Sequence, residues 1–500
     1  MEKSICMGKE KRETLPGAAL ALAISVVFSL IFYTCNTPLG AAVGSDNAMY
    51  LTMGTALARG FAPYTQIFDH KGPLLFLLQA LPQLFHGGYS TLSVFVQEVL
   101  FLWACLLVLA RMARRLGVNA LLVQLIYLAV YAPLTDGGNL TEEYANLFML
   151  MGFDVMLHVF GEGYDRERKL LAPAFAIGVT AMLCFMLRAN NVLPLCAGAG
   201  ALAVYLALCR EWRSLGVCAA GVLLGCAAAF APIALWLWQQ GAFGEMIYGA
   251  FVHNMMYAET QGQSRMQMLL SDPYGHYSIF MAGLTCLGAL CALWRTRRWP
   301  LALALVAAAG GGGLAAFLSH KFYEHYQMLA VPAAALGAAQ ILALVKDKTG
   351  LRRMVYGAAA LACAAGLFVS GQSINALRES DYAAMQSLTP DAVALYEQVP
   401  EGDRDRFLAY RVEPKWYVAT KALPCMRFYF LQEILADADP AVMDEIVSCF
   451  ETEPPLWVVL FYNRPFSPPY DERVQEIFDT RYEFVDARGE YQLLKLKETP

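Results

Sequence analysis

Two polar clusters near the start of the chain have side chains suited to transferring a group from a phosphate ester. Asp46 offers a carboxylate, which can take the proton from an attacking hydroxyl group. The segment Asp69-His70-Lys71-Gly72-Pro73 places a lysine directly before an apolar run. A lysine at the N-terminal end of a helix favours a phosphate, because backbone N–H groups there also point at the anion. The two clusters therefore predict a general base at Asp46 and a phosphate contact at Lys71.

Acidic residues in a second loop suggest a cation next to that phosphate. Glu142 and Glu143 directly precede an apolar stretch, and no basic residue of the loop from 134 to 143 balances them. Acids so close to hydrocarbon usually have a partner. A divalent cation shared with a phosphate is a candidate, so Mg²⁺ or Mn²⁺ is predicted at Glu142 and Glu143, with His70 as a further ligand. No organic cofactor is expected.

Three more cationic or titratable residues are candidates for contacting the same phosphate. Arg188 follows an apolar stretch, His253 lies in the apolar segment 251–257, and Lys321 belongs to the charged, aromatic segment 319–326. All three are predicted to face the same side of a membrane as Asp46.

Each of these residues also has a purely structural alternative. Asp46, or Ser45 before it, would cap the N-terminus of a helix. Lys71 would snorkel from an interfacial helix that starts at Pro73. His253 would be a packed side chain, and the segment 319–326 would be an interfacial aromatic belt.

The composition of the chain is that of a polytopic membrane protein. Of 500 residues, 58% are hydrophobic and 16% are charged, whereas soluble domains have about 25% charged residues. A helix needs about 17 to 25 mainly apolar residues to cross a bilayer. Eleven spans are predicted: 15–35, 90–110, 117–133, 144–160, 170–187, 191–209, 215–238, 277–294, 300–318, 327–345 and 354–370.

Basic residues predict how these spans are oriented. Lysine and arginine concentrate in alternate connecting segments, and an excess of basic residues is typical of cytoplasmic loops. This pattern predicts a cytoplasmic N-terminus, a first outer loop at 36–90 and an extracytoplasmic tail at 371–500. The apolar run 73–85 is too short for a span and is expected to lie at the interface. Cleavage of the first span as a signal peptide is the alternative to an uncleaved anchor.

The two polar parts of the chain are expected to differ in structure. In the first loop, residues 46–59 have helical spacing, which predicts that Met49, Met53, Ala56 and Leu57 face the membrane. The tail after a polar joint at 375–381 alternates apolar runs with amphipathic ones. Strands are predicted at 407–410 and 456–462, helices at 436–450 and 471–480, and a hairpin at 482–485 and 491–496. The tail is therefore predicted to be a small α/β domain without a catalytic motif.

Two classes of function are disfavoured by composition. The net charge of −5 and the lack of a basic stripe argue against a nucleic-acid partner. Most of the 13 cysteines lie inside predicted spans and have no zinc-ligand spacing. A bridge between Cys425 and Cys449 of the tail stays open.

The first loop resembles that of the membrane-embedded GT-C glycosyltransferases. The similarity consists of Asp46 in a helical outer loop, followed by Tyr50, Gly60, Pro63-Tyr64 and then Asp69 to Pro73. It is greatest to the bacterial branch related to the protein O-mannosyltransferases and the lipid A aminoarabinose transferases. One departure concerns Asn47, because the family usually has a second acid at this position.

The resemblance implies a GT-C-like membrane domain at 1–370 and a sugar transferred from a polyprenyl phosphate in the bacterial plasma membrane. Asp46 would be the catalytic carboxylate, Lys71 the contact of the donor phosphate, and Glu142 or Glu143 the supporting acid. The acceptor would be an envelope glycan, a lipid or a protein. A flippase for lipid-linked glycans or a non-enzymatic assembly partner are the alternatives. A flippase would need charges near mid-span, and the charges of this chain are expected at the span ends.

Overall fold

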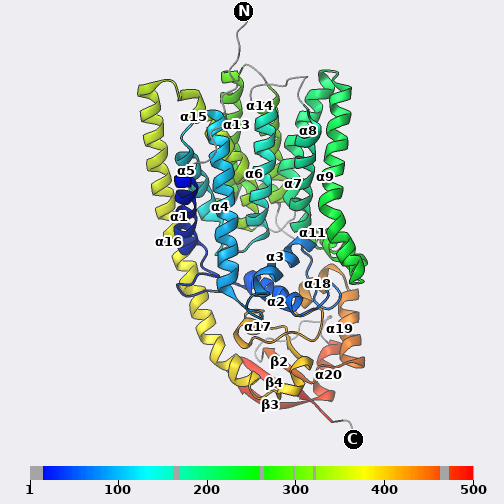
Figure 1. Cartoon of the computed structure of the whole chain (residues 1–500). Coiled ribbons are helices and arrows are strands. Elements are labelled where there is room, and N and C mark those ends of the chain that lie inside the picture. The colour runs from blue at the N-terminus through cyan, green and yellow to red at the C-terminus, as the bar shows by residue number, and fades with distance from the viewer. Residues whose placement is uncertain are drawn as a thin grey trace, which may run out of the picture.

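The computed structural model describes residues 15–160, 169–259, 264–296, 299–318, 323–461 and 472–498. A bundle of long helices forms one part, and a smaller domain that contains a sheet forms the other (Figure 1). Each of the eleven predicted spans coincides with a helix of the bundle. These helices are α1 (Leu15–Phe32), α4 (Thr91–Leu116), α5 (Ala120–Tyr131), α6 (Thr141–Phe160), α7 (Leu171–Leu187), α8 (Leu193–Leu208), α9 (Trp212–Gln239), α13 (Pro273–Thr296), α14 (Pro300–Phe317), α15 (Val331–Val345) and α16 (Thr349–Tyr396).

Short elements connect the helices of the bundle. They are η1 (Ala132–Leu134), η2 (Ala189–Val192), α10 (Phe243–Ile247), η3 (Tyr248–His253), α11 (Asn254–Glu259), α12 (Arg265–Ser271) and η4 (Glu324–Ala330). By length and composition, seven helices of the described residues are apolar enough to cross a membrane.

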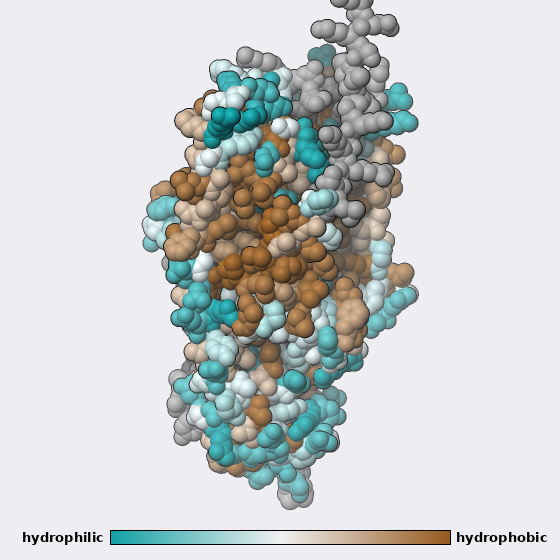
Figure 2. All heavy atoms as spheres, turned by 60° about the vertical axis from the view of Figure 1, so that its left-hand side comes forward, coloured by the Kyte–Doolittle hydropathy of each residue, from teal (hydrophilic) through white to brown (hydrophobic). Residues whose placement is uncertain are grey.

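The outer surface of the bundle is apolar. Large apolar side chains are well exposed on several helices, for example Leu223 on α9, Leu290 on α13 and Leu361 on α16. Figure 2 shows a continuous apolar band between two more hydrophilic ends. A band of this size is not tolerated in water but suits the hydrocarbon of a bilayer. The chain is therefore a polytopic membrane protein, as its composition predicts.

Small residues allow neighbouring helices to approach closely. A Cβ atom at Gly178 of α7 would lie 2.2 Å from the carbonyl oxygen of Val222, and one at Gly225 of α9 would lie 2.1 Å from that of Phe175. Without a hydrophobic driving force inside lipid, close van der Waals contact of this kind holds helices together.

Two buried acids contradict the expectation that charges lie only at the span ends. Asp154 lies inside α6 and forms ion pairs with Arg111 at 2.8 Å and Arg115 at 3.1 Å. Glu98 lies inside α4 and is fully buried. A single acid within an apolar stretch changes its mean hydropathy little, so the hydropathy of the sequence does not reveal these two residues. Such residues usually pair with other polar groups of the bundle, as Asp154 does here.

Helices α2 (Ser45–Ala58) and α3 (Pro73–Gln83) lie between the bundle and the smaller domain (Figure 1). The helix predicted at 46–59 is thus confirmed, but the prediction that Met49, Met53 and Ala56 face the membrane is wrong. Residues 47–56 are all buried, because α2 packs on α3 and on α17 (Lys415–Thr420) of the tail. The 11 residues of α3 extend only about 16 Å, too little to cross the bilayer.

Helix α16 connects the two parts of the molecule. Its 48 residues extend about 72 Å and run from the bundle into the smaller domain (Figure 1). The boundary predicted at about residue 370 and the joint predicted at 375–381 therefore lie inside a continuous helix.

The smaller domain is an α/β structure, as predicted. Its four-stranded sheet has the order β1-β2-β4-β3, in which β1 and β2 are parallel and the other pairs are antiparallel. The predicted hairpin at the end of the chain is β3 and β4. A helix predicted at 436–450 begins later, because Pro440 stands just before it. The elements are η5 (Glu401–Arg406), β1 (Phe407–Tyr410), α17, α18 (Gln432–Ala438), α19 (Ala441–Thr452), β2 (Trp457–Phe461), α20 (Glu472–Arg481), β3 (Tyr482–Arg488) and β4 (Tyr491–Leu496). Cys425 and Cys449 are free thiols.

Candidate functional site

Asp46 lies in the first turn of α2 and is exposed. The N-cap position belongs to Gly44, and no side chain caps this helix. The hydroxyl of Ser45 instead donates to Glu413 at 3.1 Å. Neither Asp46 nor Ser45 therefore has the capping role that was the structural alternative. A carboxylate in the first turn nevertheless interacts favourably with the helix dipole.

Lys71 is buried and sits at the end of a tightly held loop. Its ammonium nitrogen lies 3.6 Å from a carboxylate oxygen of Asp69 and 3.3 Å from Nε2 of His70. Its backbone N–H donates to the same Asp69 carboxylate at 2.7 Å, and its carbonyl oxygen accepts from the hydroxyl of Tyr64 at 2.8 Å. These bonds fix both the main chain and the side chain of Lys71.

Gly72 places this lysine at the N-terminal end of α3. It is the N-cap of that helix, with Pro73 as the first helical residue. Its N–H donates to the carbonyl oxygen of Leu187 at 3.0 Å. A Cβ atom at this position would lie 2.0 Å from the carbonyl oxygen of Met186. Only glycine therefore allows the loop to approach the end of α7 so closely.

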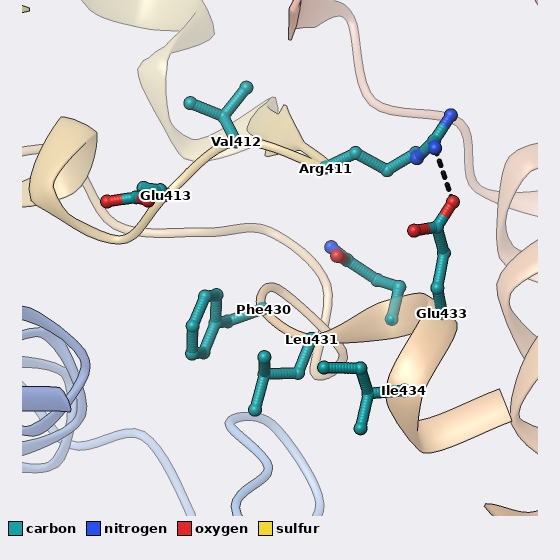
Figure 3. Close-up of a pocket in the computed structure, with 8 residues that line it drawn as sticks. Arg411, Val412, Glu413, Phe430, Leu431, Glu433 and Ile434 are labelled. Atoms are coloured by element: carbon teal, nitrogen blue, oxygen red, sulfur yellow. Dashed lines mark ion pairs between the residues drawn. The ribbon is translucent and has the colours of Figure 1, made fainter. Parts of the chain in front are cut away.

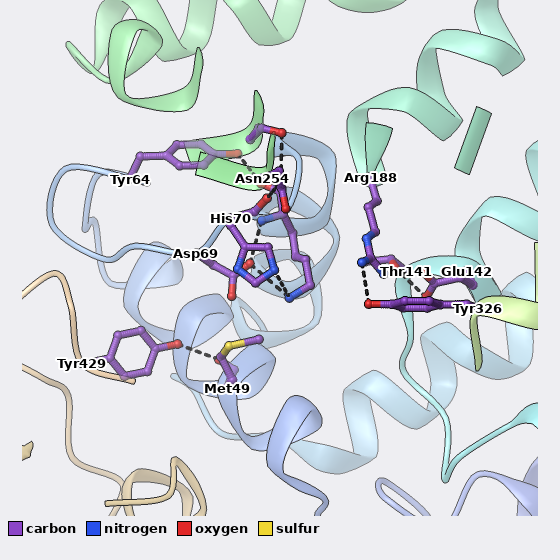
Figure 4. Close-up of polar contacts among 12 residues, drawn as sticks. Met49, Tyr64, Asp69, His70, Thr141, Glu142, Arg188, Asn254, Tyr326 and Tyr429 are labelled. Carbon is purple, nitrogen blue, oxygen red and sulfur yellow. Dashed lines mark hydrogen bonds and ion pairs between the residues drawn. The ribbon is translucent and has the colours of Figure 1, made fainter. Parts of the chain in front are cut away.

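Arg188 and Glu142 form a second buried ion pair. The guanidinium donates to Glu142 at 3.1 Å and to the hydroxyl of Tyr326 at 2.6 Å. It also lies 4.2 Å from the centre of the Tyr326 ring. In Figure 4 this group lies on one side of the view and Asp69 and His70 lie on the other. The site thus contains two cations, each with its own carboxylate partner.

Tyr50 connects these groups with Asp46. It follows Asp46 by one turn of α2, and the ammonium of Lys71 lies 5.7 Å from the centre of its ring. Burial raises the pKa of Tyr50 well above its ordinary value, the nearby carboxylates of Asp46, Asp69 and Glu142 add to the increase, and Arg188 opposes it. Tyr50 therefore remains a protonated hydrogen-bond donor among all of the charged groups.

The buried Asp69 carboxyl has a changed acidity of its own. Burial raises the pKa of Asp69 above its ordinary value, and the charge and N–H of Lys71 oppose this shift. In its ionised form the Asp69 carboxylate neutralises part of the Lys71 charge.

The three residues that were predicted to bind a metal ion each interact with a different protein group. Glu142 pairs with Arg188, and His70 lies beside the Lys71 ammonium. Glu143 accepts from the backbone N–H of Asn139 at 2.9 Å. Among the described residues, no three His, Cys, Asp or Glu side chains come together in a way that could hold a metal ion. The predicted metal-binding set is therefore not assembled in this part of the chain.

His253 has the surroundings of a packed histidine. It is fully buried, and its Nε2 lies 3.3 Å from the carbonyl oxygen of Leu435, to which it can donate. Its ring packs edge-on against Phe68 at 5.9 Å between the ring centres. Burial lowers the pKa of His253 below its ordinary value, which favours the neutral form. This placement favours the structural alternative over a phosphate contact. Lys321 lies outside the described residues.

Asn47 belongs to a buried polar network behind the site. Its amide is hydrogen-bonded to Asn36 at 3.1 Å and accepts from Asn139, and Asn36 also donates to Glu98 at 3.1 Å. Gln79 of α3 joins through Asn139 at 2.7 Å. Where the GT-C family usually has a second acid, this chain thus has an amide that anchors α2 to its neighbours.

Sequence reasoning missed the contribution of the smaller domain. The carbonyl oxygen of Arg427 accepts from the N–H of Phe68 at 3.0 Å, and its guanidinium donates to the carbonyl oxygen of Tyr64 at 3.3 Å. The hydroxyl of Tyr429 donates to the carbonyl oxygen of Met49 at 3.2 Å (Figure 4). The only sequence signal was the aromatic segment 428–430, which has no catalytic spacing. The domain covers the loop that carries Lys71.

Comparison with solved structures identifies similar folds. ArnT from Cupriavidus metallidurans bound to undecaprenyl phosphate aligns with a TM-score of 0.61 and 13% sequence identity, over 96% of this chain and 98% of that chain. The apo state of the same protein aligns with a TM-score of 0.62 and 13% identity, over 95% and 97%. No family model and no curated protein sequence matches the chain. At this identity the likeness establishes the fold. The chain thus has the fold of ArnT, and the predicted fold class, a GT-C-like polytopic membrane protein with a small α/β domain, is confirmed.

Proposed function

We propose that the protein is a membrane glycosyltransferase that moves a sugar from a polyprenyl-phosphate donor to an acceptor hydroxyl group. One observation carries this proposal. The exposed Asp46 carboxylate lies next to Tyr50, which contacts the buried cation Lys71 and is close to Arg188. A base and two cations at the end of an apolar bundle suit a donor that combines a lipid tail with a phosphate. The fold shared with ArnT, which was solved with undecaprenyl phosphate bound, supports the same class of donor.

The reaction needs one proton transfer and one displacement. The carboxylate of Asp46 takes the proton of the acceptor hydroxyl, whose oxygen forms a bond with the anomeric carbon. The bond between that carbon and the phosphate oxygen breaks, and the electron pair leaves with the polyprenyl phosphate. Attack opposite to the leaving group inverts the configuration of the anomeric carbon.

Lys71 stabilises the charge that develops on the leaving phosphate. Its ammonium group is held by Asp69 and His70 before the donor arrives, so little reorganisation is required during the reaction. The positive end of the α3 helix dipole adds to the attraction. Arg188 provides a second positive charge, which Glu142 partly balances.

The finer parts of the proposal concern location and partners. The N-terminus is proposed to be cytoplasmic, and the site and the domain at 371–500 extracytoplasmic, in a bacterial plasma membrane. The acceptor is proposed to be an envelope glycan, lipid or protein. Labelling a cysteine introduced at position 46 with a membrane-impermeant maleimide in intact cells tests this topology. Labelling only after the membrane is broken would contradict it.

The isosteric change Asp46→Asn tests the proposed reaction. Membranes with the full chain are incubated with a panel of radiolabelled sugars on undecaprenyl phosphate, and transfer into endogenous acceptors is measured. Because a general base contributes about 10²- to 10⁴-fold, transfer should decrease by that factor. Asp437→Asn is the matched control, because Asp437 is an exposed acid of the smaller domain. Undiminished transfer by Asp46→Asn would reject the base. A flippase or an assembly partner would also be unaffected by this change.

A further inference from the structure

A cavity lies in the smaller domain beside the N-terminal end of α2. It has a volume of about 90 Å³ and is lined by the segment that follows β1 and by the residues at the start of α18 (Figure 3). This volume is below that of pockets that enclose drug-sized ligands, about 300 to 1,000 Å³, so it has room for only part of a small molecule. The mechanism described above uses none of its residues. We call it the Arg411–Glu433 cavity after the ion pair on its wall.

The cavity borders the first turn of α2, which carries the proposed base. The carboxylate of Glu413 lines it and accepts a hydrogen bond from the hydroxyl of Ser45 at 3.1 Å. Ser45 directly precedes Asp46 in the chain. The side chain of Glu413 is 61% exposed, so its carboxylate is also accessible to other hydroxyl groups. A molecule held in this cavity would therefore lie beside the turn of α2 that carries Asp46.

The lining combines apolar and polar groups. Phe430, Leu431 and Ile434 lie on one side of the cavity in Figure 3. Ile434 is exposed despite being a large aliphatic residue. Glu413 lies at one end, and the Arg411–Glu433 ion pair lies at the other. A sugar ring has the matching character, because its C–H groups are apolar and its hydroxyl groups are both donors and acceptors.

The charges of the lining distinguish between classes of sugar. The positive charge of Arg411 is balanced by Glu433, and the carboxylate of Glu413 lies 3.9 Å from the ammonium of Lys415. An anionic sugar would thus gain no net attraction from the lining. A neutral sugar would instead gain charge-assisted hydrogen bonds from its hydroxyl groups to the carboxylates.

The backbone of the cavity is unusual at two positions. Arg411 and Leu431 both line it and both have positive φ angles, of 55° each. Such angles are uncommon for residues other than glycine, and they cluster at functional sites. The Arg411–Glu433 ion pair connects these two segments and helps to hold them in place.

We propose that the Arg411–Glu433 cavity is the acceptor subsite and binds a neutral carbohydrate. This inference rests on the proposed function, since it supplies the hydroxyl group that Asp46 deprotonates. The sugar packs on Phe430 and Leu431, and Glu413 accepts from one of its hydroxyl groups. The terminal residue of an uncharged glycan is the class of acceptor that fits.

Binding and turnover are measured separately to test the cavity. The purified full chain in detergent is probed by saturation-transfer NMR with methyl glycosides of neutral hexoses, β-linked neutral disaccharides and methyl glucuronide. Glu413→Ala and Phe430→Ala remove one polar and one aromatic contact. Glu483→Ala and Phe484→Ala are matched controls, because both residues are exposed on β3.

We expect at least one neutral glycoside to bind and methyl glucuronide not to bind. The affinity of the two cavity variants for that neutral glycoside should be about tenfold lower, and the affinity of the control variants should be unchanged. Equal binding by the cavity variants, or stronger binding of the glucuronide, would overturn the proposal. If donor turnover is lost in Asp46→Asn but the cavity variants bind sugar with unchanged affinity, the subsite is refuted and the proposed function stands. If sugar binds in the cavity but no donor of the panel is consumed, the proposed function fails and the acceptor role fails with it.

Discussion

The ammonium nitrogen of Lys71 lies 5.7 Å from the centre of the Tyr50 ring, and Tyr50 follows Asp46 by one turn of α2. The helix thus carries the proposed base at its end and contacts the proposed phosphate ligand one turn later. Because residues 47–56 are buried on all sides, α2 cannot turn away from Lys71 without loss of packing. The base and the phosphate contact are therefore held in a fixed relation.

The Lys71–Asp69 pair allows the catalytic and structural roles of the lysine to be separated. Lys71→Met should abolish transfer and also destabilise the fold by about 3 to 5 kcal/mol, because it leaves the Asp69 carboxylate buried without its cation. The double variant Lys71→Met/Asp69→Asn should regain stability without regaining transfer. Thermal unfolding and donor turnover are measured on all three proteins. Restored turnover in the double variant would show that Lys71 has only a structural role.

The raised pKa of Asp69 predicts how stability depends on pH. An ordinary aspartate has a pKa of about 4, and burial raises the pKa of Asp69 above this value in the folded protein. At a pH between the ordinary and the raised pKa, the folded state binds more protons than the unfolded state. The free energy of unfolding therefore decreases as the pH rises through this range. This destabilisation by Asp69 is absent below its ordinary pKa and complete above its raised pKa in the folded protein.

Asp69→Asn should remove this contribution, because the amide cannot lose a proton. As the pH rises from about 4, the unfolding temperature of Asp69→Asn should therefore increase relative to that of the unchanged chain. Differential scanning fluorimetry in one detergent over a pH series measures it. A constant difference at every pH would contradict the raised pKa.

Some of the site was predictable because it depends on neighbours in the chain. Asp46 and the segment from Asp69 to Pro73 are local, so spacing alone placed the carboxylate at a helix start and the lysine before α3. The spans were predictable for the same reason, since each apolar stretch decides locally whether it can cross a bilayer. All eleven predicted spans coincide with helices.

The remaining parts depend on which elements pack together. The pairing of Glu142 with Arg188 requires the start of α6 to lie next to the end of α7, which no local pattern indicates. Met49 and Met53 are buried because α17, more than 350 residues later in the chain, covers α2. An exposed apolar face and a covered one look identical in sequence.

The requirement for a divalent cation can be tested by chelation. Because Glu142 is paired with Arg188 and the three predicted ligands are not brought together in the described residues, we expect transfer to persist in EDTA. Turnover of the purified chain is measured with EDTA, and again after Mg²⁺ or Mn²⁺ is added. Loss of turnover that either ion restores would support the metal site predicted at Glu142, Glu143 and His70.

Gly72→Ala tests the close approach between the Lys71 loop and α7. The new methyl group would overlap the carbonyl oxygen of Met186, so the loop must move and the bond from Gly72 to Leu187 should weaken. We expect a loss of about 1 to 3 kcal/mol and reduced transfer. Gly371→Ala is the control, because a Cβ there meets no atom within 4 Å and alanine favours the helix. Equal stability of Gly72→Ala and the unchanged chain would contradict the crowding.

Arg427 connects the smaller domain to the loop that carries Lys71. Its guanidinium forms ion pairs with Glu245, at 2.7 Å, and with Glu445, and it donates to the carbonyl oxygen of Tyr64. Arg427→Gln should cost about 1 to 3 kcal/mol and loosen residues 64–70, because this loop loses a contact that the bundle does not replace. Hydrogen exchange of that loop should therefore accelerate, and transfer should decrease while the spans remain protected.

Arg473→Gln is the matched control for this change. Arg473 pairs with Asp444 at 2.9 Å, but both side chains are more than half exposed, so the pair contributes about 0 to 1 kcal/mol. Its loss should alter neither exchange nor transfer. If Arg427→Gln left the exchange of residues 64–70 unchanged, the smaller domain would not be needed to hold Lys71. If exchange accelerated without any effect on transfer, the loop would not need to be held for turnover.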